Sequence, residues 1–176
     1  AVLEKGWREA IGAVTEARRL SGVDIQLILA GDGPEKQRLE ENAPDFAHFV
    51  GFTDNARGYY AISNMGLLPT RFPAESYPLT LIECLFAGKP ILASNIGEIQ
   101  NMLQTPDGSY AGVLFDLVDW TIPIERLTTL IIECASNQEF YNRMLSAVAP
   151  AASKFDINKL YSEYDSCYEA LRNIPE

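Results

Sequence analysis

The stretch Glu75–Glu83, ESYPLTLIE, decides how this chain is expected to fold. It leads from a loop into a helix expected over Pro78–Ala87, because proline suits the first turn of a helix, where its missing N–H costs nothing. The helix is apolar nearly all round, which predicts burial, yet Glu83 stands in its middle. A buried carboxylate is costly unless it is paired or hydrogen-bonded. Glu83 therefore either meets a polar ligand or a cation, or lies on a solvent-exposed stripe, which is the commoner situation for glutamate.

Helices and strands alternate on both sides of this stretch. Short apolar strands separated by helices indicate a parallel sheet that is covered on both faces. The predicted fold is α/β: a Rossmann-like, doubly wound parallel sheet with helices on both faces and a helical C-terminal tail. We expect one domain over residues 1–176, with a core at 1–155 and a C-terminal helix at 156–176. The expected strands are 24–30, 47–50, 65–69, 90–93 and 111–115, and the expected helices are 6–20, 35–41, 55–62, 78–87, 96–103, 122–136, 138–152 and 157–172.

Composition narrows the classes of function. A chain of 176 residues is long enough to bury one good core. The net charge of −10 argues against nucleic acid, because a basic footprint supplies most of that affinity. No apolar run approaches the roughly 20 residues of a membrane helix, and the first residues lack the pattern of a secretory leader. We therefore expect a cytoplasmic protein. The three scattered cysteines and the single histidine predict neither disulfides nor a metal site.

Four polar loops each follow a predicted strand. In open α/β sheets, ligands bind beyond the carboxyl ends of the strands, so these loops should converge on one rim. The helix at Pro78 leaves the N–H groups of its first turn free to face an anion. Glu75 precedes that turn and would repel a phosphate, so it should face a neutral or cationic part of a ligand, or serve as an ordinary loop carboxylate. The loops are Gly31–Pro34, Phe52–Asp54, Thr70–Tyr77 and Ser94–Gly97.

Taken together, four segments resemble the C-terminal, donor-binding domain of retaining GT-B glycosyltransferases of the group 1, or family 4, type. Glu75-x7-Glu83 followed by AGKPILAS resembles the family's E-x7-E signature. Lys5-Gly6 resembles the K-G pair that opens the first helix of that domain. LILAGDGPEKQRLE and HFVGFTDN complete the match in the expected order, over about residues 4–105. The same order and spacing in all four segments makes the resemblance specific.

The resemblance implies a role for each matching residue. Glu75 would be the catalytic residue, binding the hexose near the reacting carbon. Lys5 would contact the diphosphate, and Glu83 would bind the ribose hydroxyls. The other implied donor contacts are Gly31 and Gly33 through close backbone approach, Phe52 and Thr53 along the base, Arg71 as a phosphate or loop cation, and Ser76, Tyr77, Pro78, Leu79 and Thr80 at the phosphate turn.

The resemblance also implies an activity. The chain would be the donor half of a hexosyltransferase that moves a sugar from a nucleoside-diphosphate sugar, with retention, to a glycan or lipid-linked acceptor. No metal or cofactor is expected. The acceptor would bind an N-terminal domain that this sequence does not contain, so the chain alone should be inactive, and the full enzyme could still associate peripherally with a membrane.

Some residues depart from the family pattern. Pro78 stands where glycine is usual, and Tyr77 where phenylalanine is usual, so the phosphate turn has one N–H fewer. The arginine that precedes the K-G pair in the family would fall before Ala1. The alternative function is a non-catalytic Rossmann-like nucleotide-binding or interaction module, although GDGPEK lacks the third glycine of the dinucleotide fingerprint.

Overall fold

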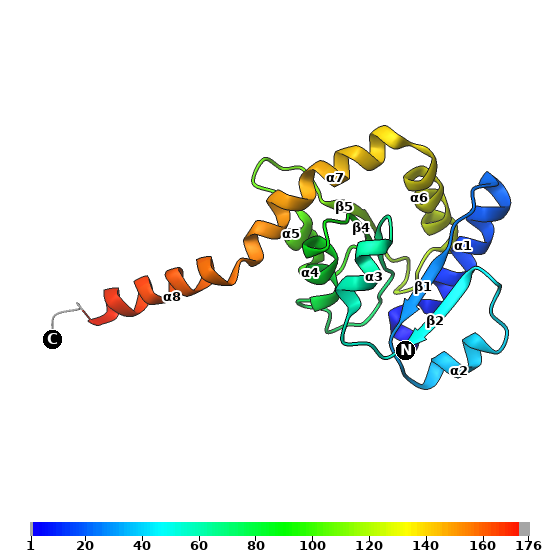
Figure 1. Cartoon of the computed structure of the whole chain (residues 1–176), viewed down its shortest axis with the longest axis horizontal. Coiled ribbons are helices and arrows are strands. Elements are labelled where there is room, and N and C mark those ends of the chain that lie inside the picture. The colour runs from blue at the N-terminus through cyan, green and yellow to red at the C-terminus, as the bar shows by residue number, and fades with distance from the viewer. Residues whose placement is uncertain (1, 173–176) are drawn as a thin grey trace.

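The computed structural model describes residues 2–172, in which five parallel strands form two sheets. In the first sheet, β1 (Leu27–Ala30) pairs with β2 (Ala47–Gly51). In the second sheet, β4 (Ile91–Ser94) lies between β3 (Gly66–Leu68) and β5 (Gly112–Phe115). Figure 1 shows the two sheets as separate ribbons within one body.

Helices alternate with these strands along the chain. The two short 3-10 helices are η1 (Leu3–Lys5) and η2 (Ser153–Phe155). The α-helices are α1 (Trp7–Ser21), α2 (Pro34–Glu40), α3 (Ala56–Ile62), α4 (Leu79–Phe86), α5 (Ile99–Leu103), α6 (Ile124–Ser136), α7 (Gln138–Ala152) and α8 (Ile157–Arg172).

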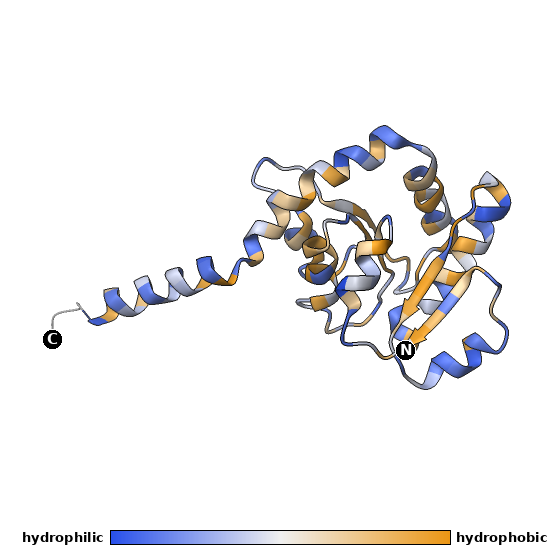
Figure 2. Cartoon of the chain, in the orientation of Figure 1, coloured by the Kyte–Doolittle hydropathy of each residue, from blue (hydrophilic) through white to orange (hydrophobic). Residues whose placement is uncertain are grey.

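The apolar core has two parts, one on each face of the larger sheet. Ile91 and Ala93 of β4 pack with buried residues of α4, α5 and α7. Leu92, between them, packs with α1, α6 and β1 instead. Successive side chains of a strand point to opposite faces, so β4 is buried on both. Figure 2 shows the strands as mostly hydrophobic ribbon, with hydrophilic residues gathered on the outer helices.

The structure confirms the predicted α/β fold, in which helices cover both faces of parallel strands and a helical tail ends the chain. Three local expectations are wrong. The strands form two sheets rather than one. The sequence pattern also suggests Asp54 as the N-cap of the helix at 55–62, but the cap of α3 is Asn55, whose side chain accepts from the Gly58 N–H. Helix α4 buries only Leu81, Cys84 and Leu85.

The C-terminal helix stands apart from the core. Helix α8 projects away from the body in Figure 1. None of its described residues is buried, and its exposed apolar side chains include Ile157, Tyr161 and Tyr164. It begins at Ile157, after η2 ends at Phe155, close to the predicted start of the tail at residue 156. The predicted domain ends, Ala1 and 173–176, lie outside the described residues.

Gly6 fixes how the chain enters α1. Its φ of 69° lies in the left-handed region, which favours glycine, and a Cβ there would collide with the Pro69 carbonyl oxygen. The glycine therefore permits a close approach between the start of α1 and the end of β3.

We predict that Gly6→Ala lowers the free energy of unfolding by about 3 kcal/mol, from left-handed strain plus a backbone clash. Gly22→Ala is the matched control, because Gly22 has a φ of 70° but nothing near its Cβ position. That variant should lose roughly 1–2 kcal/mol, from strain alone. Urea denaturation measures both, and equal losses would show that the approach to Pro69 does not constrain the fold.

Candidate active site

Glu75 lies at the centre of the site, in the loop between β3 and α4, with 8% of its surface exposed. The Lys5 ammonium donates to Glu75 Oε2 at 2.5 Å, and the Thr70 hydroxyl donates to the same oxygen at 2.9 Å. Within residues 2–172, no hydrogen bond reaches the other oxygen, Oε1. Oε1 is also not one of the fully buried polar atoms, so it can be reached from outside. One carboxylate oxygen is therefore held by the protein, and the other can receive a donor from a ligand.

Lys5 reaches Glu75 from a turn at the other end of the sequence. It ends η1, and the left-handed Gly6 then directs the chain into α1. The Lys5 ammonium also lies 5.2 Å from the centre of the Phe72 ring, a distance at which a cation is attracted to an aromatic face. The backbone N–H of Arg71 donates to the Glu4 carbonyl oxygen at 2.7 Å. These contacts hold the N-terminal turn against the loop that carries Glu75.

The predicted cation Arg71 is already paired. Its guanidinium lies 3.5 Å from a carboxylate oxygen of Glu9, in the first turn of α1. The second Glu9 oxygen, Oε2, is buried without a hydrogen-bond partner. A carboxylate near a helix N-terminus is favoured by the helix dipole, which helps Glu9 to remain there. Arg71 therefore joins the Glu75 loop to α1. Its backbone N–H also contacts Glu4, next to Lys5.

The predicted residues after β1 and β2 form a second group. The Gly31 N–H donates to the Gly51 carbonyl at 2.7 Å, and a Cβ on Gly31 would touch the Trp7 ring. Gly33 is the N-cap of α2 and has a φ of 142°, a conformation that favours glycine. Phe52 is 82% exposed. The Thr53 hydroxyl accepts from the Asn55 N–H at 3.0 Å. Trp7, two residues after Lys5, brings Gly31 next to the first group.

No described hydrogen bond or ion pair joins Phe52 or Thr53 to the cluster around Glu75. Both groups of loops follow the carboxyl ends of parallel strands. The segment that leads into α1 lies between them: Gly6 approaches Pro69 after β3, and Trp7 approaches Gly31 after β1. The part of the chain that the structure describes thus brings Lys5, Arg71 and Glu75 together, with Gly31 beside them.

The turn before α4 offers fewer free N–H groups than the sequence suggested. The Ser76 N–H donates to the Ala74 carbonyl at 2.9 Å, and the Leu81 N–H donates to the Pro78 carbonyl at 3.1 Å. The expectation that the first-turn N–H groups are all free is therefore wrong, because the Leu81 N–H is bonded to the residue just before α4. Leu79 and Thr80 are exposed and lie in the first turn, where N–H groups lack partners within a helix.

Tyr77 points away from that turn. Its ring meets the Phe155 ring edge to face, with centres 5.8 Å apart, and joins the loop to η2. Gly97 packs on the backbone at the other side, where a Cβ would collide with the Glu75 carbonyl oxygen. Contacts with Phe155 of η2 and with Gly97, just before α5, therefore hold the Glu75 loop on two sides.

Glu83 is half-buried on α4, and no described hydrogen bond or ion pair reaches its carboxylate. The helix is not buried on every side, because Leu79 is 68% exposed at its start. Its inner face is inert: burial raises the pKa of the neighbouring Cys84 thiol to about 12, so that thiol stays protonated at neutral pH. Glu83 is the ionisable side chain of α4 that remains available to a ligand.

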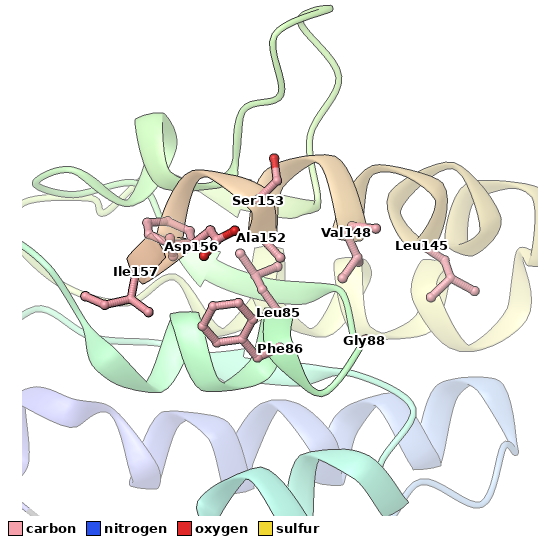
Figure 3. Close-up of a pocket in the computed structure, with 11 residues that line it drawn as sticks. Leu85, Phe86, Gly88, Leu145, Val148, Ala152, Ser153, Asp156 and Ile157 are labelled. Atoms are coloured by element: carbon pink, nitrogen blue, oxygen red, sulfur yellow. The ribbon is translucent and has the colours of Figure 1, made fainter. Parts of the chain in front are cut away.

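A cavity of about 660 Å³ lies elsewhere, between α4, α7 and the start of α8. Figure 3 shows Leu85 and Phe86 on one side of it and Ser153, Asp156 and Ile157 on the other. None of the predicted donor-binding residues lines this space. The cavity is mostly apolar and holds no cation, so it does not suit a diphosphate, and the loops at the strand ends remain the candidate site.

Sequence reasoning missed Thr70 and Glu9. Thr70 is fully buried and holds Glu75, while Glu9 pairs with Arg71. A threonine directly after an apolar strand, five residues before the key glutamate, was the available signal for the first. Glu9 lies in the first turn of a helix, where acidic residues are common, so nothing in the sequence indicated that it pairs with Arg71. Within residues 2–172, no three histidine, cysteine, aspartate or glutamate side chains gather as a metal site, and no helix is long and apolar enough to cross a membrane.

The family assignment follows from comparison with known proteins. The family model described as glycosyl transferases group 1 matches residues 2–132. The chain belongs to the group 1 glycosyltransferases. This match includes the Lys5 turn, the Glu75 loop and α4, so the residues gathered in the site are those of a family domain.

Individual relatives agree with this assignment. The N-acetyl-alpha-D-glucosaminyl L-malate synthase of Bacillus anthracis is 27% identical over 163 residues, which are 89% of this chain and 41% of that protein. A GDP-mannose-dependent alpha-(1-6)-phosphatidylinositol dimannoside mannosyltransferase of Mycobacterium tuberculosis is 30% identical over 107 residues, 58% of this chain and 26% of that protein. This chain thus spans less than half the length of these relatives.

Solved structures show the same fold. The Anabaena protein Alr3699/HepE, in complex with UDP and glucose, superposes with a TM-score of 0.78 at 18% identity. The match covers 97% of this chain and 46% of the Anabaena chain. The GtfA/B complex gives a TM-score of 0.82 at 19% identity, over 99% of this chain and 35% of that one. At these identities the likeness establishes the Rossmann-like architecture.

We predict that Thr70→Val lowers the free energy of unfolding by about 1.5–3 kcal/mol, because the buried Glu75 carboxylate and the Phe72 N–H each lose a hydrogen bond to the Thr70 hydroxyl. Thr128→Val is the matched control. Thr128 is also buried, but its hydroxyl donates only to the Ala13 carbonyl oxygen at 3.3 Å. That oxygen lies within α1, where it also accepts a hydrogen bond of the helix.

The control variant should lose about 1 kcal/mol or less in the same chemical denaturation experiment. A Thr70→Val loss no larger than that of Thr128→Val would mean that Thr70 does not stabilise the Glu75 carboxylate.

Proposed function

We propose that this chain is the donor-binding half of a hexosyltransferase and binds a nucleoside-diphosphate sugar at the loops around Glu75. The observation that carries the proposal is the contact between Lys5 and Glu75, in the loop that leads into α4, in a chain of the group 1 family. The arrangement combines a cation, a buried carboxylate and first-turn N–H groups. Those are the features that a diphosphate joined to a sugar needs.

The diphosphate would lie between the Lys5 ammonium and the first turn of α4. An acidic protein with a net charge of −10 can hold a diphosphate only where cations and helix N-termini are local. Lys5 supplies the cation, and the exposed Leu79 and Thr80 supply the N–H groups. Electrostatic stabilisation of the leaving diphosphate at this place is the main catalytic contribution that the chain can make.

Glu75 would hold the sugar. Its Oε2 already accepts from Lys5 and Thr70, and its Oε1 remains available for a sugar hydroxyl. Lys5 would then lie between the carboxylate and the phosphate, so it would compensate both charges at once. The half-buried Glu83 would accept the vicinal hydroxyls of the ribose, and Phe52 and Thr53 would border the base.

Transfer with retention, an acceptor of glycan or lipid-linked type, and the need for a second domain belong to this proposal. They rest on the E-x7-E pattern and on the larger size of the relatives, of which this chain spans 41% or less in the two sequences described. The alternative is a nucleotide-binding or interaction module without transfer activity. It would keep the Lys5 contact to phosphate but would not need Glu75 beside it.

The proposal is tested by isothermal titration of the chain with UDP, GDP and ADP and with their hexose conjugates. At least one nucleotide should bind, and Lys5→Met should weaken that binding about tenfold or more, as expected for a lost contact between a cation and a phosphate. Lys159→Met is the control, because Lys159 lies on the exposed α8 and also carries one positive charge.

Equal losses in the two variants would attribute the effect to net charge rather than to the site. The absence of heat with every nucleotide at millimolar concentration would contradict donor binding by this chain.

A further inference from the structure

The short helix η2 connects the two supports of the Glu75 loop. It follows α7, whose last residues Ala151 and Ala152 are buried, and it precedes α8, in which no described residue is buried. Two adjacent residues of η2, Lys154 and Phe155, make contacts with segments far away in the sequence. Lys154 reaches the segment on one side of the Glu75 loop, and Phe155 reaches the loop itself.

Lys154 holds the C-terminal end of α5. Its ammonium donates to the carbonyl oxygens of Asn101 and Gln104, at 2.6 and 2.5 Å. The last carbonyl groups of a helix have no partner within the helix, and a cation there also interacts favourably with the helix dipole. The Thr105 N–H, which would continue the helix by donating to Asn101, donates to the Ser109 carbonyl instead. Lys154 therefore supplies the donor that the backbone of α5 lacks at this end.

The other end of α5 lies against the Glu75 loop. Gly97 precedes α5 by two residues, and a Cβ on it would collide with the Glu75 carbonyl oxygen and lie 3.7 Å from the Ser76 Cα. Helix α5 has only five residues, so its two ends are a short distance apart and move together. A shift at the end that Lys154 holds therefore reaches the backbone at Glu75.

Phe155 contacts the phosphate turn directly. Its ring and the Tyr77 ring meet with their centres 5.8 Å apart and their planes at 77°, the edge-to-face arrangement that aromatic pairs prefer. Tyr77 is 55% exposed, so burial alone does not fix its position. The N–H groups of Leu79 and Thr80 follow Tyr77 by two and three residues. The contact with Phe155 therefore helps to set where those N–H groups lie.

Open space on another side of η2 makes these contacts more important. Phe155, Ser153 and Asp156 line the apolar cavity of about 660 Å³ between α4, α7 and the start of α8 (Figure 3). Protein interiors are normally close-packed, but side chains do not fill this space. Packing alone therefore does not hold η2 on the cavity side, and its position depends on the contacts that Lys154 and Phe155 make.

We propose that Lys154 and Phe155 are positioning residues for the diphosphate of the donor, an inference that rests on the function proposed above. Neither residue contacts the ligand. Lys154 acts through α5 and Gly97, and Phe155 acts through Tyr77. Together they hold the backbone of residues 75–80, so that the Glu75 carboxylate and the first-turn N–H groups of α4 keep one spacing. The distal phosphate, which carries the sugar, lies at this turn, so these two residues affect it more than they affect the base and the ribose.

The experiment is isothermal titration of the chain and its variants with two ligands: the nucleoside diphosphate that binds best among UDP, GDP and ADP, and the corresponding monophosphate. Phe155→Leu and Lys154→Met should each weaken diphosphate binding about fivefold or more, because hydrogen bonds to phosphate weaken steeply when their geometry changes. Binding of the monophosphate, which lacks the distal phosphate, should change by less than about twofold. Tyr161→Leu and Lys159→Met on the exposed α8 are the controls, and neither should change either affinity.

Conservative and double variants separate positioning from a general loss of structure. Phe155→Tyr keeps an aromatic ring in contact with Tyr77 and should restore diphosphate binding. Tyr77→Leu should weaken that binding about as much as Phe155→Leu does, and the double variant should lose no more than either single one, because both changes remove the same contact. Tyr77 is more than half exposed, so Tyr77→Leu also tests the contact if Phe155→Leu does not fold.

Three results would overturn the inference, and they have different meanings. Equal losses for the diphosphate and the monophosphate would show that the variants loosen the whole domain rather than the phosphate turn. Unchanged diphosphate affinity in Phe155→Leu, Lys154→Met and Tyr77→Leu, beside normal binding by the wild-type chain, would remove the positioning role and leave the proposed function intact. A wild-type chain that binds no nucleoside diphosphate would instead contradict the proposed function, and this inference with it.

Discussion

The contact between Lys5 and Glu75 joins residues 70 positions apart in the sequence, and the candidate site depends on it. Lys5 belongs to the turn that leads into α1, and Glu75 to the loop that leads into α4. Those two helices serve the two halves of the core on opposite faces of the larger sheet. The ion pair therefore lies where the two halves meet, and Thr70 and the Glu4 carbonyl surround it with further bonds from the protein.

Two close approaches by glycine make this contact possible. Gly6 lets the Lys5 turn lie on the Pro69 carbonyl, and Gly97 lets the next loop lie on the Glu75 carbonyl. Both glycines have positive φ angles and both would bring a Cβ into a backbone oxygen. The geometry of the site is thus determined by backbone packing around Glu75 as much as by the charged side chains.

Much of this could be predicted from the sequence, because the determining signals are local. Alternating short apolar strands and amphipathic helices gave the α/β class, and the spacing of Glu75 and Glu83 with Lys5 and Gly31 indicated the family. The partners of these residues could not be predicted, because burial and pairing depend on contacts between distant segments. Thr70 holds Glu75, and its place directly after an apolar strand is the one local sign of that role. Glu9 pairs with Arg71, and nothing in the sequence around Glu9 indicates that contact. The separation of the strands into two sheets could not be predicted either, because local periodicity does not say which strands pair.

We propose that Glu75 faces the sugar while Lys5 serves the diphosphate, and the Glu75→Gln variant tests this assignment. Affinities of the variant are measured for a nucleoside diphosphate and for the corresponding nucleoside-diphosphate hexose. The hexose conjugate should bind the variant less tightly, while the diphosphate alone should bind as well as before or better, because Lys5 no longer shares its charge with Glu75. A parallel loss for both ligands, or no loss for either, would contradict the assignment of Glu75 to the sugar.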